Sequence, residues 1–550
     1  ALIGIIVWVV RQKQNDSADY FLGGRDATWL AIGASIFASN IGSEHLIGLA
    51  GAGASSGMAM AHWEIQGWMI LILGWVFVPF YSRSMVYTMP EFLERRYNPQ
   101  SRTILSVISL VSYVLTKVAV TVYAGGLVFQ QVFGIKELWG IDFFWIAAIG
   151  LVVLTALYTI FGGMKSVLYT SVLQTPILLL GSLIILVLGF KELGGWDEMM
   201  RVCGAVTVND YGDTMTNLIR SNDDANFPWL GALIGSAIIG FWYWCTDQFI
   251  VQRVLSGKNE KEARRGTIFG AYLKLLPVFL FLIPGMIAFA LHQKYIGAGG
   301  EGFLPMLANG TANADAAFPT LVAKLLPAGV KGLVVCGILA ALMSSLASLF
   351  NSSAMLFTID FYKRFRPETP EKKLVGIGQI ATVVIVILGI LWIPIMRSVG
   401  DVLYTYLQDV QSVLAPGIAA AFLLGICWKR TSAQGGMWGL IAGMIIGLTR
   451  LGAKVYYSNA GEVADSTFKY LFYDMNWLFF CGWMFLFCII VVIVVSLATE
   501  APTAEKIQGL VFGTATKEQK AATRASWDHW DIIHTVIILA ITGAFYWYFW

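Results

Sequence analysis

Residues 31–53 read AIGASIFASNIGSEHLIGLAGAG, and this stretch decides how the chain is interpreted. It is long and apolar enough to cross a bilayer, which takes about 20 residues. Its middle nevertheless carries Asn40, Ser43, Glu44 and His45 within six positions. Polar and ionisable groups at membrane depth are costly, so they usually face a cavity, a partner or an ion. The stretch predicts a broken helix whose free carbonyls and amides can form a site, rather than a continuous helix whose small residues pack on a neighbour.

Composition places most of the chain in lipid. Of the 550 residues, 57% are hydrophobic and only 13% are charged, whereas soluble domains carry about 25% charged residues. The basic residues are spread through loops, with no basic patch interleaved with aromatics, which argues against a nucleic-acid partner. The sequence has no HExxH or Walker motif, so a membrane-embedded enzyme is a poor interpretation.

Apolar runs of spanning length recur along the whole chain. Together with the segment 1–10, ALIGIIVWVV, which we expect to be the end of a truncated first membrane helix, they predict an all-α integral membrane protein of about fourteen spans. The runs are 28–54, 63–82, 103–131, 143–162, 165–190, 228–255, 267–292, 330–361, 374–396, 402–427, 434–456, 470–498 and 530–549.

The loop charges predict the orientation in the membrane. Twenty-three of the 37 lysines and arginines fall in one alternating set of loops, which is therefore expected to be cytoplasmic. Both termini then lie on the outer side of a cell membrane. The long loops 191–227 and 293–329 are also external in this scheme, and we expect them to carry short surface helices.

A second unusual run points to an internal repeat. Residues 228–255 read PWLGALIGSAIIGFWYWCTDQFIVQRVL, with glycines midway, then clustered aromatics and a carboxylate. Two odd helices at corresponding positions of two halves are a pointer to a binding site between inverted repeats. We therefore expect five-helix repeats at 28–190 and 228–427. Peripheral helices at 434–550 would follow, with a cytoplasmic loop at 499–528.

Several polar residues within the apolar runs have two interpretations each. Lys274 lies far from either end of its run, so it must snorkel, pair or lose its proton, and we favour a functional or paired role. Glu64 is either a site carboxylate or an interfacial one beside a tryptophan belt. Gln408 can bind a hydroxyl with its amide or join two helices. Lys117 is expected to be a structural ion-pair partner, with Asp247 as the candidate.

Adjacent hydroxyls and aromatics offer two further candidates. Residues 341–348 read ALMSSLAS, which is either a tight packing stripe or, through Ser344 and Ser345, part of a sodium site completed by carbonyls of the broken helix. Tyr243 and Trp244 are either core or belt aromatics, or flat platforms for a sugar ring.

These residues together resemble a known family. The stretches GASIFASNIGSEHLIGLAGAGASSGMA (33–59), FWYWCTDQFIVQRVLSGKN (241–259) and ALMSSLASLFNSSAMLFTIDFY (341–362) carry the likeness, with YLKLLP (272–277) and PGIAAAFLLGICWKR (416–430) in support. The chain resembles the sodium/solute symporters, and within them the sodium/glucose cotransporters. The resemblance implies a LeuT-type fold of two inverted five-helix repeats plus peripheral helices, with alternating access driven by sodium.

The resemblance also implies roles for individual residues. Tyr243 would be the inner gate stacked under the sugar. The substrate contacts would be Asn40, His45, Glu64, Tyr243, Trp244, Lys274 and Gln408. Sodium would be bound by the carbonyls of Ala38, Ile41 and Ala341 and the hydroxyls of Ser344 and Ser345.

Two departures from the family pattern affect these expectations. The family usually has an aspartate where this chain has Ser171, so we predict one sodium ion per substrate. Gly240 stands where relatives carry a polar side chain facing the sugar.

We expect a sodium-coupled importer of a neutral, glucose- or galactose-like monosaccharide, monomeric or loosely dimeric in the bilayer. The alternatives are a transporter of myo-inositol, another polyol or a sugar acid, and a non-transporting sugar sensor of the same fold.

Overall fold

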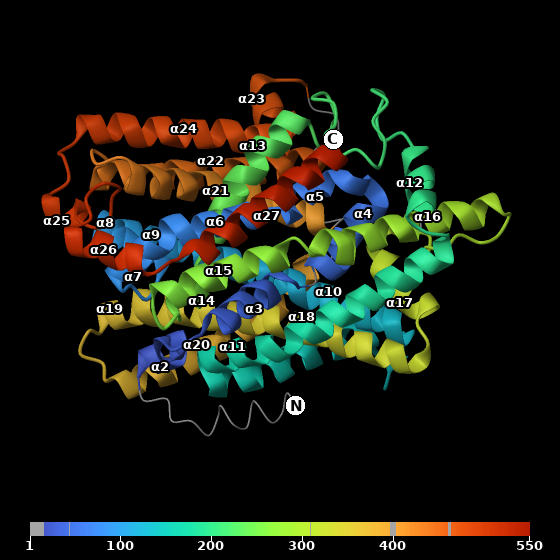
Figure 1. Ribbon diagram of the computed structural model, residues 1–550, viewed down its shortest axis with the longest axis horizontal. Coiled ribbons are helices and arrows are strands. Elements are labelled where there is room, and N and C mark those ends of the chain that lie inside the picture. Colours follow the sequence, from blue (N-terminus) through green and yellow to red (C-terminus); the bar gives the residue numbers. More distant parts are fainter. Residues whose placement is uncertain (1–15, 43, 308–309, 397–402, 460–463) are drawn as a thin grey trace.

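The computed structural model is a bundle of long helices that run in broadly the same direction (Figure 1). It describes residues 16–42, 44–307, 310–396, 403–459 and 464–550. Segment 1–10, predicted to be a truncated helix, lies outside the described residues. Within them the only strands, β1 (Glu137–Leu138) and β2 (Ile141–Asp142), pair antiparallel in a small hairpin. The all-α prediction is therefore confirmed for the described chain.

The helix predicted to break within residues 31–53 does so. Helix α3 (Trp29–Asn40) ends at Ile41, which has an extended backbone with φ −79° and ψ 98°. The chain becomes helical again in the π-helical turn η2 (Glu44–Leu49) and continues as α4 (Ala50–Ser56). The last carbonyls of α3 thereby lose helical partners, which makes them available to other donors or ions.

The second unusual run is also interrupted. Helix α13 (Trp229–Gly240) passes into the π-helical turn η6 (Phe241–Thr246), and α14 (Gln248–Leu255) follows. The break falls at Asp247, whose backbone is extended and whose side chain caps α14 by accepting from the amide of Phe249. An aspartate at this position is a favourable N-cap.

The remaining elements have the following bounds. In the first half they are α2 (Ser17–Leu22), η1 (Gly23–Arg25), η3 (Gly57–Met60), α5 (Ala61–Glu64), α6 (Gly67–Ile72), η4 (Leu73–Phe77), α7 (Val78–Ser84), α8 (Met89–Arg96), α9 (Pro99–Ser112), η5 (Tyr113–Val118), α10 (Ala119–Phe133), α11 (Phe143–Leu193) and α12 (Trp196–Gly204). In the second half they are α15 (Glu260–Lys274), η7 (Val278–Leu282), α16 (Ile283–Gly297), η8 (Ala314–Ala316), α17 (Ala317–Leu325), α18 (Ala328–Met355), η9 (Leu356–Tyr362), α19 (Lys363–Phe365), α20 (Glu371–Met396), α21 (Leu403–Cys427), α22 (Ala433–Asn459), α23 (Thr467–Lys469), η10 (Tyr470–Asp474), α24 (Trp477–Ala498), α25 (Ala504–Ile507), α26 (Lys517–Ala525) and α27 (His529–Tyr548).

Ten helices of the described chain are long and apolar enough to cross a membrane, compared with about fourteen predicted runs. Breaks and kinks account for much of the difference. The run that begins the first predicted repeat is interrupted after Asn40, which leaves Trp29–Asn40 short of spanning length. Two predicted runs are instead joined in α11, a 51-residue helix that bends at Gly163, where φ is +53°. A glycine tolerates this left-handed conformation at little cost.

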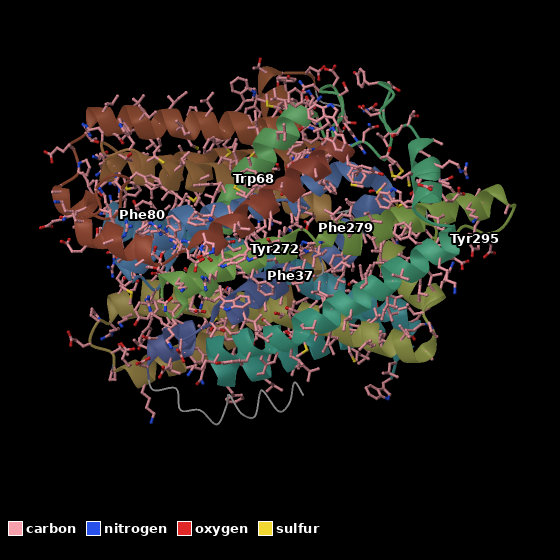
Figure 2. The ribbon with its side chains drawn as sticks, viewed as in Figure 1. Phe37, Trp68, Phe80, Tyr272, Phe279 and Tyr295 are labelled. Carbon is pink, nitrogen blue, oxygen red and sulfur yellow. The ribbon has the colours of Figure 1, made fainter. Side chains whose placement is uncertain are left out.

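The two ends of the bundle carry different loops. Helices α7, α8, α19, α25 and α26 lie at one end, and α12 and the C-terminus lie at the other (Figure 1). Figure 2 shows Phe80 near the first end and Tyr295 near the second, with Phe37 between them. The first end holds loops that the charge pattern predicted to be cytoplasmic, and α12 and α17 are the short helices expected in the opposite loops.

Helix α3 lies in the interior, packed against α15, α11 and α18. Small residues allow this close approach. A methyl group on Gly266 of α15 would lie 2.6 Å from the side chain of Ile32, and one on Gly33 would lie 2.5 Å from that of Phe269. Glycines at such contacts bring two membrane helices together without a steric penalty. The packing holds the broken end of α3 at the centre of the bundle.

Candidate functional site

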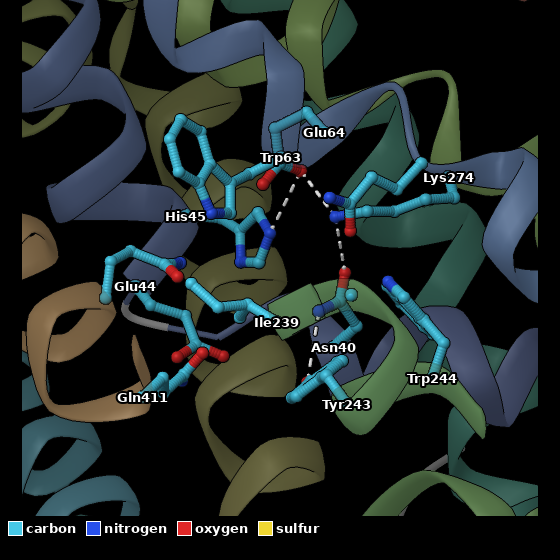
Figure 3. A pocket seen from close by; sticks show the side chains of 13 residues that line it. Asn40, Glu44, His45, Trp63, Glu64, Ile239, Tyr243, Trp244, Lys274 and Gln411 are labelled. Carbon is cyan, nitrogen blue, oxygen red and sulfur yellow. Dashed lines mark hydrogen bonds and ion pairs between the residues drawn. The ribbon is translucent and has the colours of Figure 1, made fainter. Parts of the chain in front are cut away.

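The broken end of α3 opens onto a polar cavity inside the bundle (Figure 3). All seven residues predicted to contact substrate line this cavity: Asn40, His45, Glu64, Tyr243, Trp244, Lys274 and Gln408. They come from segments more than 350 residues apart in the sequence, so the fold brings them together.

A hydrogen-bonded chain connects five of these side chains (Figure 3). The Lys274 ammonium donates to Glu64 Oε2 over 2.7 Å and to Asn40 Oδ1 over 3.0 Å. His45 Nε2 lies 3.1 Å from the same Glu64 oxygen. The Asn40 amide in turn donates to the Tyr243 hydroxyl over 3.1 Å. Glu64 is thus a buried carboxylate that pairs with Lys274 and lines the cavity.

Helix ends place these polar groups in the interior. Asn40 is the last residue of α3, Glu64 the last of α5 and Lys274 the last of α15. His45 and Tyr243 lie in the π-helical turns η2 and η6. A cation near a helix C-terminus is stabilised by the helix dipole, and irregular backbone at membrane depth is tolerated where it lines a cavity.

Aromatic rings form one wall of the cavity. Tyr243 and Trp244 pack edge to face, with ring centroids 4.9 Å apart. The Lys274 ammonium lies 5.3 Å from the centroid of the Trp244 ring, a cation–π distance. A flat aromatic face beside hydrogen-bonding groups suits a ring-shaped ligand with an apolar face and polar edges.

The lining also includes six residues outside the predicted set: Glu44, Trp63, Gln66, Ile239, Gly240 and Gln411. Gln411 could have been found, because it follows Gln408 by three positions and therefore shares its helix face. Gln66 could not be placed by helical spacing, since the chain leaves the α-helical conformation between α5 and α6.

Gln66 occupies the space that Gly240 leaves. A methyl group on Gly240 would lie 2.5 Å from Gln66 Oε1. The Gln66 amide is held by a 2.8 Å hydrogen bond to the carbonyl of Ser236, one turn earlier on α13. An amide from another helix thus lies directly beside Gly240 in the cavity lining.

The cavity is small and is partly lined by aromatic side chains. Its volume of about 40 Å³ leaves room for only a few water molecules, each of which needs about 10–15 Å³. Trp63 lines it and stacks on Trp477 of α24, with centroids 5.5 Å apart. On another side, the Lys117 ammonium lies 4.7 Å from the Tyr243 ring centroid. A larger ligand requires side chains to move.

The predicted ion pair between Lys117 and Asp247 is confirmed. Lys117 Nζ lies 2.5 Å from Asp247 Oδ2, and both side chains are buried. The Tyr113 hydroxyl donates to the other carboxylate oxygen. The pair therefore connects the end of η5 to the break between η6 and α14, directly beside the Tyr243 ring.

Two of the predicted sodium ligands, Ser345 and Ile41, lie close together at the same helix break. Ser345 of α18 donates to the carbonyl of Ser39 over 2.9 Å and lies 3.4 Å from the carbonyl oxygen of Ile41. Ser344 lies 3.2 Å from the Ser171 hydroxyl of α11. Ala38 and Ala341 are buried in the same two helices, α3 and α18.

These oxygen ligands fit a hard monovalent cation. They consist of hydroxyls and of carbonyls released at the end of α3, all neutral oxygens. Oxygen ligands suit hard cations, whereas soft metals prefer thiolate or imidazole. The hydrogen bond from Ser345 to the Ser39 carbonyl was not predicted. It adds a third carbonyl of the α3 terminus, after those of Ala38 and Ile41, to the candidate sodium ligands.

A helix broken at the centre of a membrane-spanning bundle, with a buried polar cavity on one side and neutral oxygens on the other, defines the class of secondary transporters. Sequence and structure comparisons agree. A family model described as "Sodium:solute symporter family" matches residues 20–443. The chain is 36% identical to sodium/myo-inositol cotransporter 2 of Homo sapiens over 93% of its own length and 77% of that protein. It is 37% identical to the sodium/myo-inositol cotransporter of Canis lupus familiaris, over 93% and 74%.

The fold has a solved counterpart. A structure described as a substrate-bound outward-open state of a Na⁺-coupled sialic acid symporter superposes with a TM-score of 0.71. It covers 91% of this chain and 98% of the other at 22% identity, so the likeness is one of fold. The chain belongs to the sodium:solute symporter family. It is therefore a multi-pass membrane protein that couples solute transport to sodium, and it is not an enzyme.

Proposed function

We propose that the protein imports a neutral cyclic polyol of the myo-inositol type together with sodium. The relatives reported above are named as sodium/myo-inositol cotransporters, which favours this alternative over the glucose- or galactose-like substrate expected first. The observation that carries the proposal is the cavity itself, where amide, carboxylate, ammonium and imidazole groups meet beside two aromatic rings.

The lining suits a ring with hydroxyls on all its edges. Glu64 accepts hydrogen bonds and Lys274 donates them, while the Asn40 amide does both. Gln408 has a buried carbonyl oxygen with no hydrogen-bond partner among the described residues. Because a buried polar atom without a partner is costly, we propose that a substrate hydroxyl donates to it. Trp244 and Tyr243 would pack on the apolar face of the ring, and His45 would orient Glu64.

Charge balance supports a neutral substrate. Lys274 is already paired with Glu64 at 2.7 Å, so a substrate carboxylate would compete with a buried anion for the same ammonium. Glu44 also lines the cavity and adds a second carboxylate. An anionic substrate would therefore meet net repulsion, which weighs against a sugar acid.

One helix break would couple the two ligands. The Asn40 side chain faces the substrate cavity, whereas the carbonyls of Ser39 and Ile41, its neighbours in the chain, face Ser345. Sodium bound by Ala38, Ile41, Ala341, Ser344 and Ser345 would fix this backbone and so orient Asn40. A ligand shifts a conformational equilibrium only through its differential affinity for the two states, so sodium must bind the outward-facing state more tightly.

We further propose the arrangement of the chain. Repeats at 28–190 and 228–427 would be related by inversion, since each begins with an interrupted helix, and 434–550 would form peripheral helices. The end of the bundle with α8 and α26 would be cytoplasmic, which leaves the C-terminus outside. One sodium ion would accompany each substrate, because Ser171 supplies a hydroxyl instead of a carboxylate beside Ser344.

Competition identifies the substrate. Sodium-dependent uptake of labelled myo-inositol into proteoliposomes is measured with unlabelled myo-inositol, glucose, galactose or sialic acid as competitors. The proposal expects competition by myo-inositol at the lowest concentration and none by sialic acid. Stronger competition by a hexose would indicate that the substrate is a sugar and not a polyol. Substrate-gated current without accumulation would instead indicate a sensor.

A further inference from the structure

A second polar cavity lies at the end of the bundle where α7 and α8 meet the loop 499–528. It measures about 390 Å³ and is separate from the substrate cavity. We propose that it binds a phosphate monoester, supplied either by a phospholipid headgroup or by a soluble phosphate ester. Its charged and amide side chains are Arg83, Arg95, Glu505, Lys506, Gln508 and Gln519.

Distant parts of the sequence build this cavity. Arg83 belongs to α7, whereas Lys506 belongs to α25, more than 400 residues later. The ring of Phe512 packs edge to face on Phe80, with centroids 5.1 Å apart, and Figure 2 shows Phe80 at this end of the bundle. Arg83 also donates to Thr523 over 2.8 Å. The loop 499–528 thus packs on the first half of the chain, and the cavity lies between this loop and helices α7 and α8.

Two cationic groups of the cavity form no close ion pair in the described chain, although the Glu260 carboxylate exerts an electrostatic attraction on Arg83. Arg95 pairs with Glu91 at 2.9 Å. By contrast, Arg83 and Lys506 form no ion pair within the described chain, and Arg83 Nε is buried without a hydrogen-bond partner there. Lys506 donates only to the carbonyl of Glu94, over 2.8 Å. An anion that binds here would satisfy both cations.

Phosphate fits these groups better than other anions do. The arginine fork matches two phosphate oxygens, and a lysine adds a point charge. Two unpaired cations balance the double negative charge of a monoester, and Gln508 and Gln519 offer amides for its remaining oxygens. Glu505 is solvent-exposed, so water screens its repulsion.

The size and position of the cavity further restrict the class of ligand that it can bind. A volume of about 390 Å³ falls in the range of about 300–1,000 Å³ usual for small-molecule sites, which favours a headgroup over a folded peptide. The cavity also lies at the bundle end expected to be cytoplasmic. Basic pockets on that side of a membrane protein are suited to phosphorylated headgroups.

The experiment measures thermal unfolding of the full chain in phosphatidylcholine nanodiscs. Phosphatidylinositol 4-phosphate is the lipid probe, and phosphatidylserine at equal total charge controls for bulk surface potential. Inorganic phosphate and myo-inositol monophosphate are the soluble probes. A ligand that binds only the folded state raises the unfolding midpoint. The variants are Arg83→Gln and Lys506→Gln, with Lys520→Gln as a matched control because that lysine is exposed on α26 outside the cavity.

We expect at least one monoester probe to raise the midpoint, with an apparent affinity weakened at least about tenfold in Arg83→Gln and Lys506→Gln, as for loss of a charged hydrogen bond. Lys520→Gln should behave as the unaltered chain. A response to the lipid alone or to the soluble probes alone supports the proposal and identifies the source. Sodium-dependent uptake in phosphatidylcholine shows that each variant is folded. Equal stabilisation by phosphatidylserine, a response unchanged in both variants, or no response to any probe would overturn the proposal.

Discussion

Replacing Lys274 by methionine should destabilise the protein more than replacing Lys274 and Glu64 together. The two side chains form a 2.7 Å ion pair in which they are 4% and 1% exposed. Removing one member of such a pair costs about 3–5 kcal/mol, because the other charge stays buried without its partner. Glu64 would keep His45, whose Nε2 lies 3.1 Å away. We therefore expect a cost of about 3 kcal/mol for Lys274→Met, the low end of that range.

The double variant Glu64→Gln/Lys274→Met removes both charges. Replacing a whole buried pair by neutral groups of similar size is often close to neutral in free energy. The unfolding midpoint of the purified protein should therefore be lowest in Lys274→Met and recover in the double variant. Both variants should lose uptake, so stability is the informative measurement. Lys294→Met is a suitable control, since Lys294 is exposed and donates only to the Leu193 carbonyl.

If Lys274→Met is as stable as the unaltered protein, burying Glu64 without Lys274 has no cost in stability. A double variant less stable than both single variants, Lys274→Met and Glu64→Gln, would show that the two residues contribute independently. Either result would refute the assignment of a coupled buried pair. The double-mutant cycle is the appropriate design because the two residues are in direct contact.

The remaining predictions concern the two ligands. Ser345→Ala should raise the sodium concentration for half-maximal uptake about tenfold, as for loss of a hydroxyl that contacts an ion; Ser353→Ala, on the same helix, should leave it unchanged. Gly240→Ala should raise the KM for polyol without loss of folded protein, because the new methyl group would lie 2.5 Å from Gln66 Oε1. An unchanged KM would mean that Gln66 does not contact substrate. Ser171→Asp should raise the Hill coefficient for sodium above one, and a coefficient that stays at one would remove this residue from the ion site.

Much of the architecture follows from local sequence. Asn40 and the polar residues that follow it predicted the break in α3, because such groups at membrane depth usually face a cavity, a partner or an ion. The position of the second break was harder to predict. The sequence marked residues 228–255 as unusual without giving a break point, and the helix passes through Gly240 and breaks at Asp247. The reason is that Asp247 can cap the following helix, whereas a glycine in a packed helix is tolerated.

The site was predicted as a set of residues but not as a network. Lys274 was recognisable because a lysine far from both ends of an apolar run needs a partner. Its partner could not be deduced, since Glu64 lies 210 residues away in the sequence. The role of Gln66 was also hidden, because it depends on the volume that Gly240 vacates on another helix. Such contacts depend on tertiary packing, which spacing along one helix does not encode.

The central claim is that inward sodium flow drives accumulation of a neutral polyol through this cavity. The most direct test is uptake of labelled myo-inositol into proteoliposomes with and without an inward sodium gradient. The account predicts accumulation above the external concentration only with the gradient, and a Hill coefficient of one for sodium. Uptake that is equal without sodium, or that never exceeds equilibration, would contradict it.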